Sequence, residues 1–224
     1  MSTPTPVPCL TSEVEDTLTR LVAKFETTAR LAPGPILRTN PEQYEENLMA
    51  MKDTRTLADV ATMEECLALI RVPLLEYMDN LIESREVFKT DILGSTDYEA
   101  TSQAAFLNFY LALVDLRKTE ALKFGKIQPA EGRIVFEIDS EFNFDLKTYY
   151  LKNTASLVAK FVSYQIFIEK DGNKEILVDG TLETILSSET VELSWHRNRE
   201  DLDRGIQMED VQFEIIEVYI STGE

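Results

Sequence analysis

The sequence predicts an α+β protein in which an N-terminal helical bundle is followed by an antiparallel β-sandwich. The first observation is that apolar residues recur at helical spacing from residue 12 to about residue 125. The second is that apolar and polar residues alternate after Pro129. Helices that precede strands favour segregated layers or separate domains. We therefore expect a proline-rich arm over 1–11, a helical domain over 12–126 and a β-sandwich domain over 130–222.

The first ten residues carry alternating prolines at Pro4, Pro6 and Pro8. Proline fixes φ and lacks a backbone donor, so this pattern excludes a helix and favours an extended, polyproline-like arm. Because such an arm can dock on a neighbouring subunit, the three prolines are candidate interaction residues.

Two capping signals open the helical region. Ser12 followed by Glu15 predicts a capping box at the start of the first helix, which the Pro-Gly-Pro of residues 33–35 stops. Asn40 before Pro41 predicts a short second helix, with asparagine as the cap and proline at the first helical position.

Two further signals follow along the chain. Residues 62–65 (Thr-Met-Glu-Glu) predict the start of a third helix, which Pro73 should kink or break. Residues 96–99 predict the cap of a long final helix that ends before Gly125. That helix is apolar almost all round over residues 104–116, so we expect it to be the central, buried member of the bundle.

The β region is predicted from alternation and from turn residues. Residues 171–173 (Asp-Gly-Asn) and 179–180 (Asp-Gly) predict hairpin turns, and no proline follows Pro129. The alternating apolar positions form six series: Ile134, Phe136 and Ile138; Phe142, Phe144, Leu146 and Tyr150; Val162, Tyr164, Ile166 and Ile168; Ile176 and Val178; Val191, Leu193 and Trp195; Val211, Phe213, Ile215 and Tyr219.

Charge and targeting signals restrict the partners. The 224 residues include 22 Lys and Arg against 40 Asp and Glu, a net charge of −18. Such a protein repels nucleic-acid phosphates and anionic lipid, so neither is expected as a direct partner. The N-terminus has no basic or apolar segment, and no apolar run is long enough to span a bilayer. We expect a cytoplasmic or particle-associated protein without a signal peptide or transmembrane segment.

The two cysteines, Cys9 and Cys66, are too few for a disulfide scaffold. Cys66 shares a helical face with Met63, Leu67 and Ile70, which predicts a buried thiol. The sequence neither requires nor excludes a disulfide to Cys9, and we expect a reducing compartment.

No catalytic site is predicted. His196 is the only histidine, and Ser194 and Asp201 lie near it in sequence, but no nucleophile elbow frames them. We expect His196 to begin a polar loop, and we expect the protein not to be an enzyme.

No metal or cofactor is predicted either. Asp171, Asn173 and Glu175 imitate the start of a calcium loop, but Ile176 and Leu182 occupy the positions that need Gly and Glu. This segment is expected to be a hairpin turn, and the acidic residues within 139–145 and 201–210 to be solvated. The sequence also lacks a phosphate-binding loop and a dinucleotide motif.

The densest charged segment covers residues 196–205. It mixes both signs, which suits the rim of a protein–protein contact or an ordinary surface loop. Its candidate interaction residues are Arg197, Arg199, Asp201, Asp203 and Arg204.

Together these features favour a non-enzymatic structural or assembly subunit of a virion, tail or secretion-type particle. Its partners would be other protein subunits, in a homo-oligomer or a larger assembly. An alternative is an acidic inhibitor or DNA mimic that occupies a nucleic-acid-binding enzyme. A third hypothesis is a carbohydrate-binding β-sandwich on a helical stalk.

Overall fold

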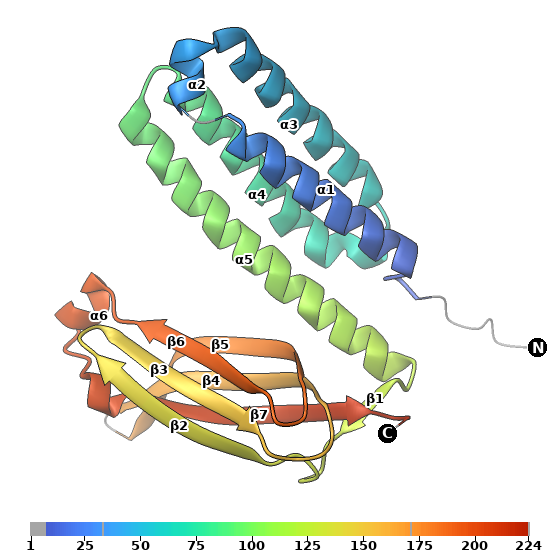
Figure 1. Ribbon diagram of the computed structural model, residues 1–224, viewed down its shortest axis with the longest axis vertical. Helices are drawn as coiled ribbons and strands as arrows, with labels where there is room; N and C mark the ends of the chain where they lie inside the picture. Colours follow the sequence, from blue (N-terminus) through green and yellow to red (C-terminus); the bar gives the residue numbers. More distant parts are fainter. Residues whose placement is uncertain (1–7, 33, 171, 224) are drawn as a thin grey trace, which may run out of the picture. The chain divides into compact units, whose positions relative to one another are not determined.

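The computed structural model describes residues 8–32, 34–170 and 172–223 (Figure 1). It forms two compact units, Met1–Glu120 and Ala121–Glu224. Helices come first and antiparallel sheets second, which confirms the predicted α+β class. No helix within the described residues is long and apolar enough to cross a membrane.

The helical unit is built around an apolar core of side chains from all four long helices. This core includes Phe25, Met51, Leu74, Met78 and Phe109. Its elements are α1 (Ser12–Arg30), α2 (Gly34–Thr39), α3 (Pro41–Ala61), the 3₁₀ turn η1 (Glu65–Leu67), α4 (Ala68–Phe88) and α5 (Ile92–Lys123).

Caps at two helix starts agree with the sequence only in part. Asn40 caps α3 through the Gln43 N–H and proline follows it, as predicted, but α3 has 21 residues and is not short. The α1 cap is Thr11, whose hydroxyl accepts from the Val14 N–H, so the predicted Ser12 capping box is wrong by one residue.

The other two predicted caps are wrong. Thr62 is the C-cap of α3, and its hydroxyl donates back to the Ala58 carbonyl. Helix α5 begins four residues before Thr96, where the Asp91 carboxylate accepts from the Leu93 and Gly94 N–H groups. Neither threonine caps a helix N-terminus, because each hydroxyl bonds back to a carbonyl of its own helix, Ala58 for Thr62 and Leu93 for Thr96. Pro73 does not break α4, which runs through it without interruption.

Helix α5 is not the buried centre of the bundle. Leu107 is 56% exposed and Tyr110 is 43% exposed, so its apolar sequence does not reflect burial on every side. A groove of about 300 Å³ also remains between α1 and α5, with Leu18, Phe106 and Phe109 in its walls.

The two cysteines form a disulfide with their Cα atoms 6.1 Å apart. Cys66 is exposed, so the prediction of a buried thiol is wrong. It lies in η1, directly before the buried core residue Leu67. Since disulfides persist in oxidising environments, the pairing disfavours the reducing compartment suggested by the cysteine count.

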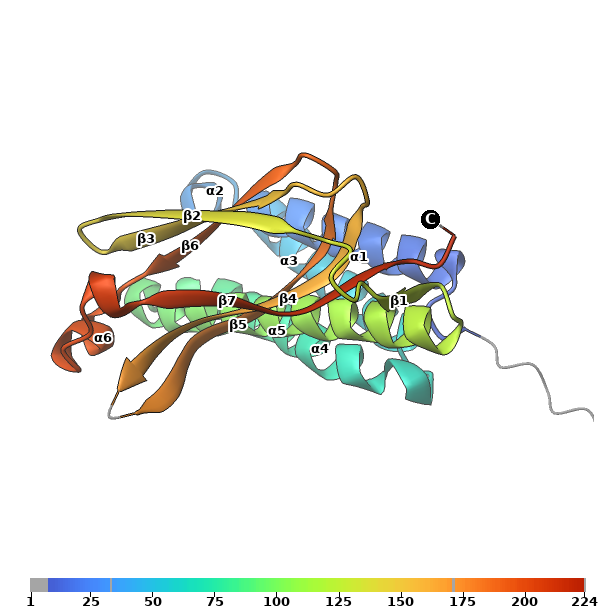
Figure 2. The same ribbon diagram turned by 90° about the horizontal axis from the view of Figure 1, so that it is seen from below.

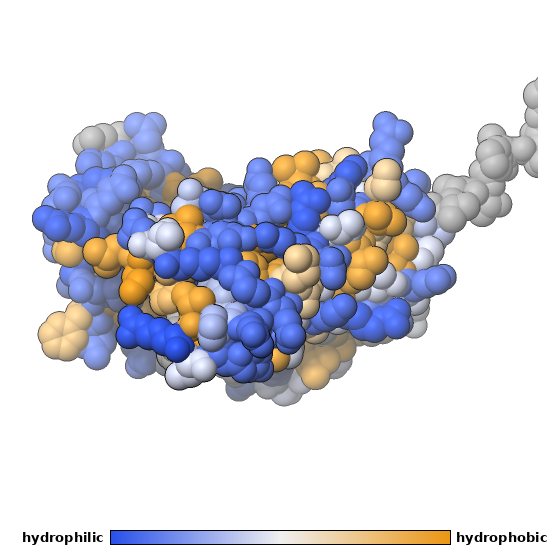
Figure 3. All heavy atoms as spheres, turned by 90° about the horizontal axis from the view of Figure 1, so that it is seen from above, coloured by the Kyte–Doolittle hydropathy of each residue, from blue (hydrophilic) through white to orange (hydrophobic). Residues whose placement is uncertain are grey.

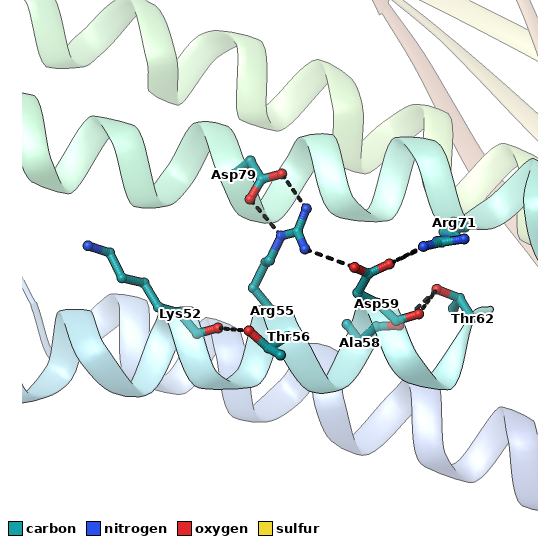
Figure 4. Close-up of polar contacts among 8 residues, drawn as sticks. All are labelled: Lys52, Arg55, Thr56, Ala58, Asp59, Thr62, Arg71 and Asp79. Atoms are coloured by element: carbon teal, nitrogen blue, oxygen red, sulfur yellow. Dashed lines mark hydrogen bonds and ion pairs between the residues drawn. The ribbon is translucent and has the colours of Figure 1, made fainter.

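Helices α3 and α4 are joined by a chain of ion pairs (Figure 4). Arg55 donates to both carboxylate oxygens of Asp79, at 2.8 and 2.9 Å, and reaches Asp59 at 3.2 Å. Arg71 completes the chain on the other oxygen of Asp59. The guanidinium of Arg71 lowers the pKa of Asp59 below its ordinary value.

The β-unit is a sandwich of two antiparallel sheets, with strand orders β1-β7-β4-β5 and β2-β3-β6 (Figure 2). Two short helical elements lie between β6 and β7. The elements are β1 (Ile127–Pro129), β2 (Phe136–Asn143), β3 (Leu146–Asn153), β4 (Ala159–Lys170), β5 (Asn173–Ile185), β6 (Thr190–His196), α6 (Arg199–Asp203), η2 (Met208–Asp210) and β7 (Gln212–Ser221).

Aromatic side chains pack between the two sheets. The Phe213 ring stacks on Tyr149 at 5.1 Å and on Tyr164 at 5.6 Å between centroids. Tyr149 donates its hydroxyl to the Val211 carbonyl at 2.8 Å, and burial raises its pKa to about 12. Trp195 is buried in the same cluster.

Two turns lie elsewhere than the sequence indicated. Residues 179–180 are inside β5: a Cβ on Gly180 would lie 2.6 Å from the Tyr164 ring, so this glycine makes room for a side chain. The series 142–150 crosses a hairpin, because Phe144 takes a φ of 50° between β2 and β3. The hairpin turn at Gly172 joins β4 to β5 as predicted, and Asp171 lies outside the described residues.

Candidate protein-interaction site

The end of the predicted arm is attached to its own chain. The backbone N–H groups of Cys9 and Leu10 donate to the Glu120 carboxylate, the second at 2.9 Å. Pro8 is half-buried beside them, whereas Pro4 and Pro6 lie outside the described residues. This arrangement anchors the arm where it enters α1.

Arg197, the first candidate interaction residue in the charged segment 196–205, holds the β-unit together. Its guanidinium donates to the Asp145 carboxylate at 2.9 and 2.6 Å and to the Ile206 carbonyl at 3.1 Å. Only 15% of its side chain is exposed. It thus links the β2–β3 hairpin to the segment after α6.

The rest of that segment divides into bound and exposed residues. Asp201 is buried and forms a capping box with Asn198 at the start of α6. Arg204 forms ion pairs with Glu175 and, at 3.6 Å, with Asp201. Arg199 and Asp203 are exposed on α6.

The residues around His196 do not form a nucleophile–base pair. The Ser194 hydroxyl lies 3.3 Å from that of Thr148, and Asp201 accepts from the Asn198 N–H. Within the described chain, no group of three or more His, Cys, Asp or Glu side chains could hold a metal ion.

A different candidate site lies along β2, one edge of its sheet. β2 pairs with β3 over all eight of its residues, without a bulge, and no other strand in the described chain pairs with it. Seven of these eight residues are exposed. β2 also contains neither proline nor lysine, two residues that commonly protect edge strands.

The ladder shows which backbone groups are free. The Thr154 N–H donates to the Val135 carbonyl at 2.9 Å, which extends the β2–β3 ladder by one residue. Backbone groups in an antiparallel pair point alternately toward and away from the partner strand. The backbone N–H and C=O groups that point away from β3 are therefore those of Phe136, Ile138, Ser140 and Phe142.

The side chains of these four residues lie on the inner face of the sheet, in register with Tyr149 and Leu151. Ile138 is nevertheless 47% exposed and Phe142 50% exposed. At the opposite edge, the inward side chains Leu193 and Trp195 of β6 are buried. The sandwich is thus closed at its β6 side and open at β2.

The outer face of β2 is acidic, since Glu137, Asp139 and Glu141 alternate with the inward residues. Tyr150 donates its hydroxyl to Glu141 at 2.6 Å. That hydrogen bond raises the pKa of Tyr150 to about 12, and desolvation and the negative charges of Glu141, Glu192 and Asp139 add to the shift.

Sequence reasoning identified these residues as a strand but not as a site. The alternation of Phe136, Ile138 and Phe142 resembles that of any half-buried strand. Only the sheet order, which places β2 at an edge without a covering strand, makes them distinctive.

No protein-family model and no curated protein matches this sequence. Among solved structures, the trimeric lipoprotein SadB of Salmonella enterica is similar at 12% identity, over 67% of this chain and 94% of that chain. The TM-score is 0.24, which does not establish a common fold. The candidate site therefore rests on the geometry of this chain alone.

Proposed function

We propose that this protein is a non-enzymatic subunit of a larger assembly and that it binds its partner through the free edge of β2. The observation that carries the proposal is an eight-residue edge strand that pairs only with β3 within the described residues and whose inward side chains Ile138 and Phe142 are half exposed. An added strand would satisfy the outward backbone groups and cover both side chains.

The disulfide indicates the kind of cellular compartment in which this assembly would form. Cys9 and Cys66 are paired, and such bonds persist outside reducing compartments. An exported or particle-bound setting is therefore favoured over the cytoplasm.

The alternative of a DNA mimic receives less support. A mimic needs carboxylates on one continuous face, without interleaved cations. On α3 and α4 the carboxylates of Asp59, Asp79 and Glu86 are instead paired with Arg and Lys.

The proposal is tested by site-specific photo-crosslinking in cells that produce the protein. A photoreactive phenylalanine analogue at Phe142 should crosslink to one defined protein, whereas the same analogue at the exposed Leu69 of α4 should not. Ser140→Pro should abolish the crosslink by removing an outward N–H, and Ser140→Ala, which keeps it, should not. Equal crosslinking at both positions, or no effect of Ser140→Pro, would overturn the proposal.

A further inference from the structure

The two faces of the β2 edge differ in chemistry, and this difference specifies the strand that fits there. A strand laid along β2 places its alternate side chains beside Ile138 and Phe142 on the inner face. Its other side chains lie beside Glu137, Asp139 and Glu141 on the outer face. The inner row is apolar except for Ser140, and the Lys147 ammonium lies 5.1 Å from the centre of the Phe142 ring. The outer row is anionic, and Glu137 forms an ion pair with Lys152 of β3 at 3.8 Å.

A second copy of the chain is a poor occupant. Antiparallel pairing of two β2 strands centred on Ser140 would place each Asp139 opposite Glu141 of the second copy. Like charges directly opposite one another destabilise a strand pair. The acidic row therefore opposes self-association at an edge that is otherwise open to it.

We propose that the partner of β2 is an extended strand with Lys or Arg at every second residue and apolar side chains between them. This inference rests on the proposed function and names the chemistry of the partner. The apolar row completes the open side of the sandwich against Ile138 and Phe142. The basic row lies beside Asp139, Glu141 and the exposed Glu137, whose ion pair with Lys152 at 3.8 Å it would share. These carboxylates attract a basic strand and repel an acidic one.

The Asp139 carboxylate affects strand binding in a second way, through a hydrogen bond to the backbone of β2. Its carboxylate accepts from the Ser140 N–H at 2.8 Å, so it occupies one of the outward donors. An incoming backbone carbonyl must replace that hydrogen bond. A basic side chain opposite Asp139 compensates the carboxylate as it leaves the N–H, so a basic strand displaces it more readily than a neutral one.

The test uses the full chain and capped synthetic octapeptides as probes. These are an alternating Lys–Val peptide, a scrambled peptide of the same composition and an alternating Glu–Val peptide. Binding is followed by fluorescence anisotropy of the labelled peptide. We expect binding of the alternating Lys–Val peptide alone, with loss of affinity as salt screens the charges.

Two matched triple variants isolate the acidic row. Glu137→Gln/Asp139→Asn/Glu141→Gln should weaken Lys–Val binding about tenfold, as expected for three cross-strand charge pairs. Glu46→Gln/Asp53→Asn/Glu76→Gln removes the same net charge from exposed positions of the helical unit and should leave affinity unchanged. Thermal unfolding confirms that both variants remain folded.

The remaining outcomes overturn the inference in distinguishable ways. Equal binding of Lys–Val and Glu–Val peptides, abolished by Ser140→Pro, would refute the basic partner and keep the edge as the site. Equal binding of the scrambled peptide would reduce the effect to general attraction by an acidic protein. Absence of Lys–Val binding refutes the inference, and the proposed function then stands or falls with the crosslink at Phe142.

Discussion

The two units of this protein are stabilised in different ways. The helical unit has cross-links at its surface, including the Cys9–Cys66 disulfide and the ion pairs of Arg55. The β-unit contains no cysteine, and its aromatic core is covered on the β6 side but not along β2. The comparison shows that the disulfide lies in the helical unit, whereas the β-unit relies on ion pairs such as Arg197–Asp145 and has outward backbone groups on β2 that pair with no strand in the described chain.

The largest effect should come from the disulfide, which joins positions 57 residues apart. Replacing both cysteines by serine should destabilise the helical unit by about 2–4 kcal/mol, because the unfolded chain loses a constraint. Far-UV circular dichroism follows the helices, and the fluorescence of Trp195, the only tryptophan, follows the β-unit. A parallel loss in the Trp195 signal would show that the units do not unfold separately.

The β-unit should be most sensitive to its internal glycine. Gly180→Ala places a Cβ against the Tyr164 ring and should destabilise this unit by about 1–3 kcal/mol. Gly223→Ala is the control, since nothing lies within 4 Å of its added carbon. Urea unfolding followed by Trp195 fluorescence measures both, and equal midpoints would mean that Tyr164 can move aside.

A smaller effect is expected from the ion pairs between α3 and α4. Arg55→Ala should cost about 1 kcal/mol in the helical unit, since it removes a two-pronged contact with Asp79 at a partly exposed site. Arg55→Lys keeps the positive charge but cannot form the bidentate hydrogen bond with Asp79, so it should recover only part of the lost stability. Full recovery by lysine, in chemical unfolding at low salt, would contradict this interpretation.

The smallest effect concerns the pKa values of two tyrosines on opposite faces of β3. Tyr149 and Tyr150 both have a pKa of about 12, the first through burial and the second through Glu141 and nearby charges. A raised pKa favours the protonated phenol in the folded chain, so its contribution is present below the ordinary value of 10.0 and is lost as pH rises through about 12.

Tyrosine-labelled NMR titrations can separate the two causes. Glu141→Gln and added salt should lower the pKa of Tyr150 and leave that of Tyr149 unchanged. If both values shifted together, the acidic face would not be what perturbs Tyr150.

Periodicity predicted the order of helices and strands because it reflects which face of each element is buried. It failed where one residue type serves two purposes. The sequence predicts that Thr62 opens a helix, but Thr62 ends one. It also predicts a turn at Gly180, but this glycine makes room for Tyr164 inside a strand. The open edge could not be predicted, since whether Ile138 is covered depends on strand order, which alternation does not encode.

The most direct test of the central claim is amide hydrogen exchange along β2 in the free protein. Residues 137, 139 and 141 should be protected by hydrogen bonds to β3, whereas Ile138 and Phe142 should exchange fast. Binding of the alternating Lys–Val peptide should then protect Ile138 and Phe142. Uniform protection along β2 in the free chain, or no protection at these two residues with the peptide bound, would contradict the account.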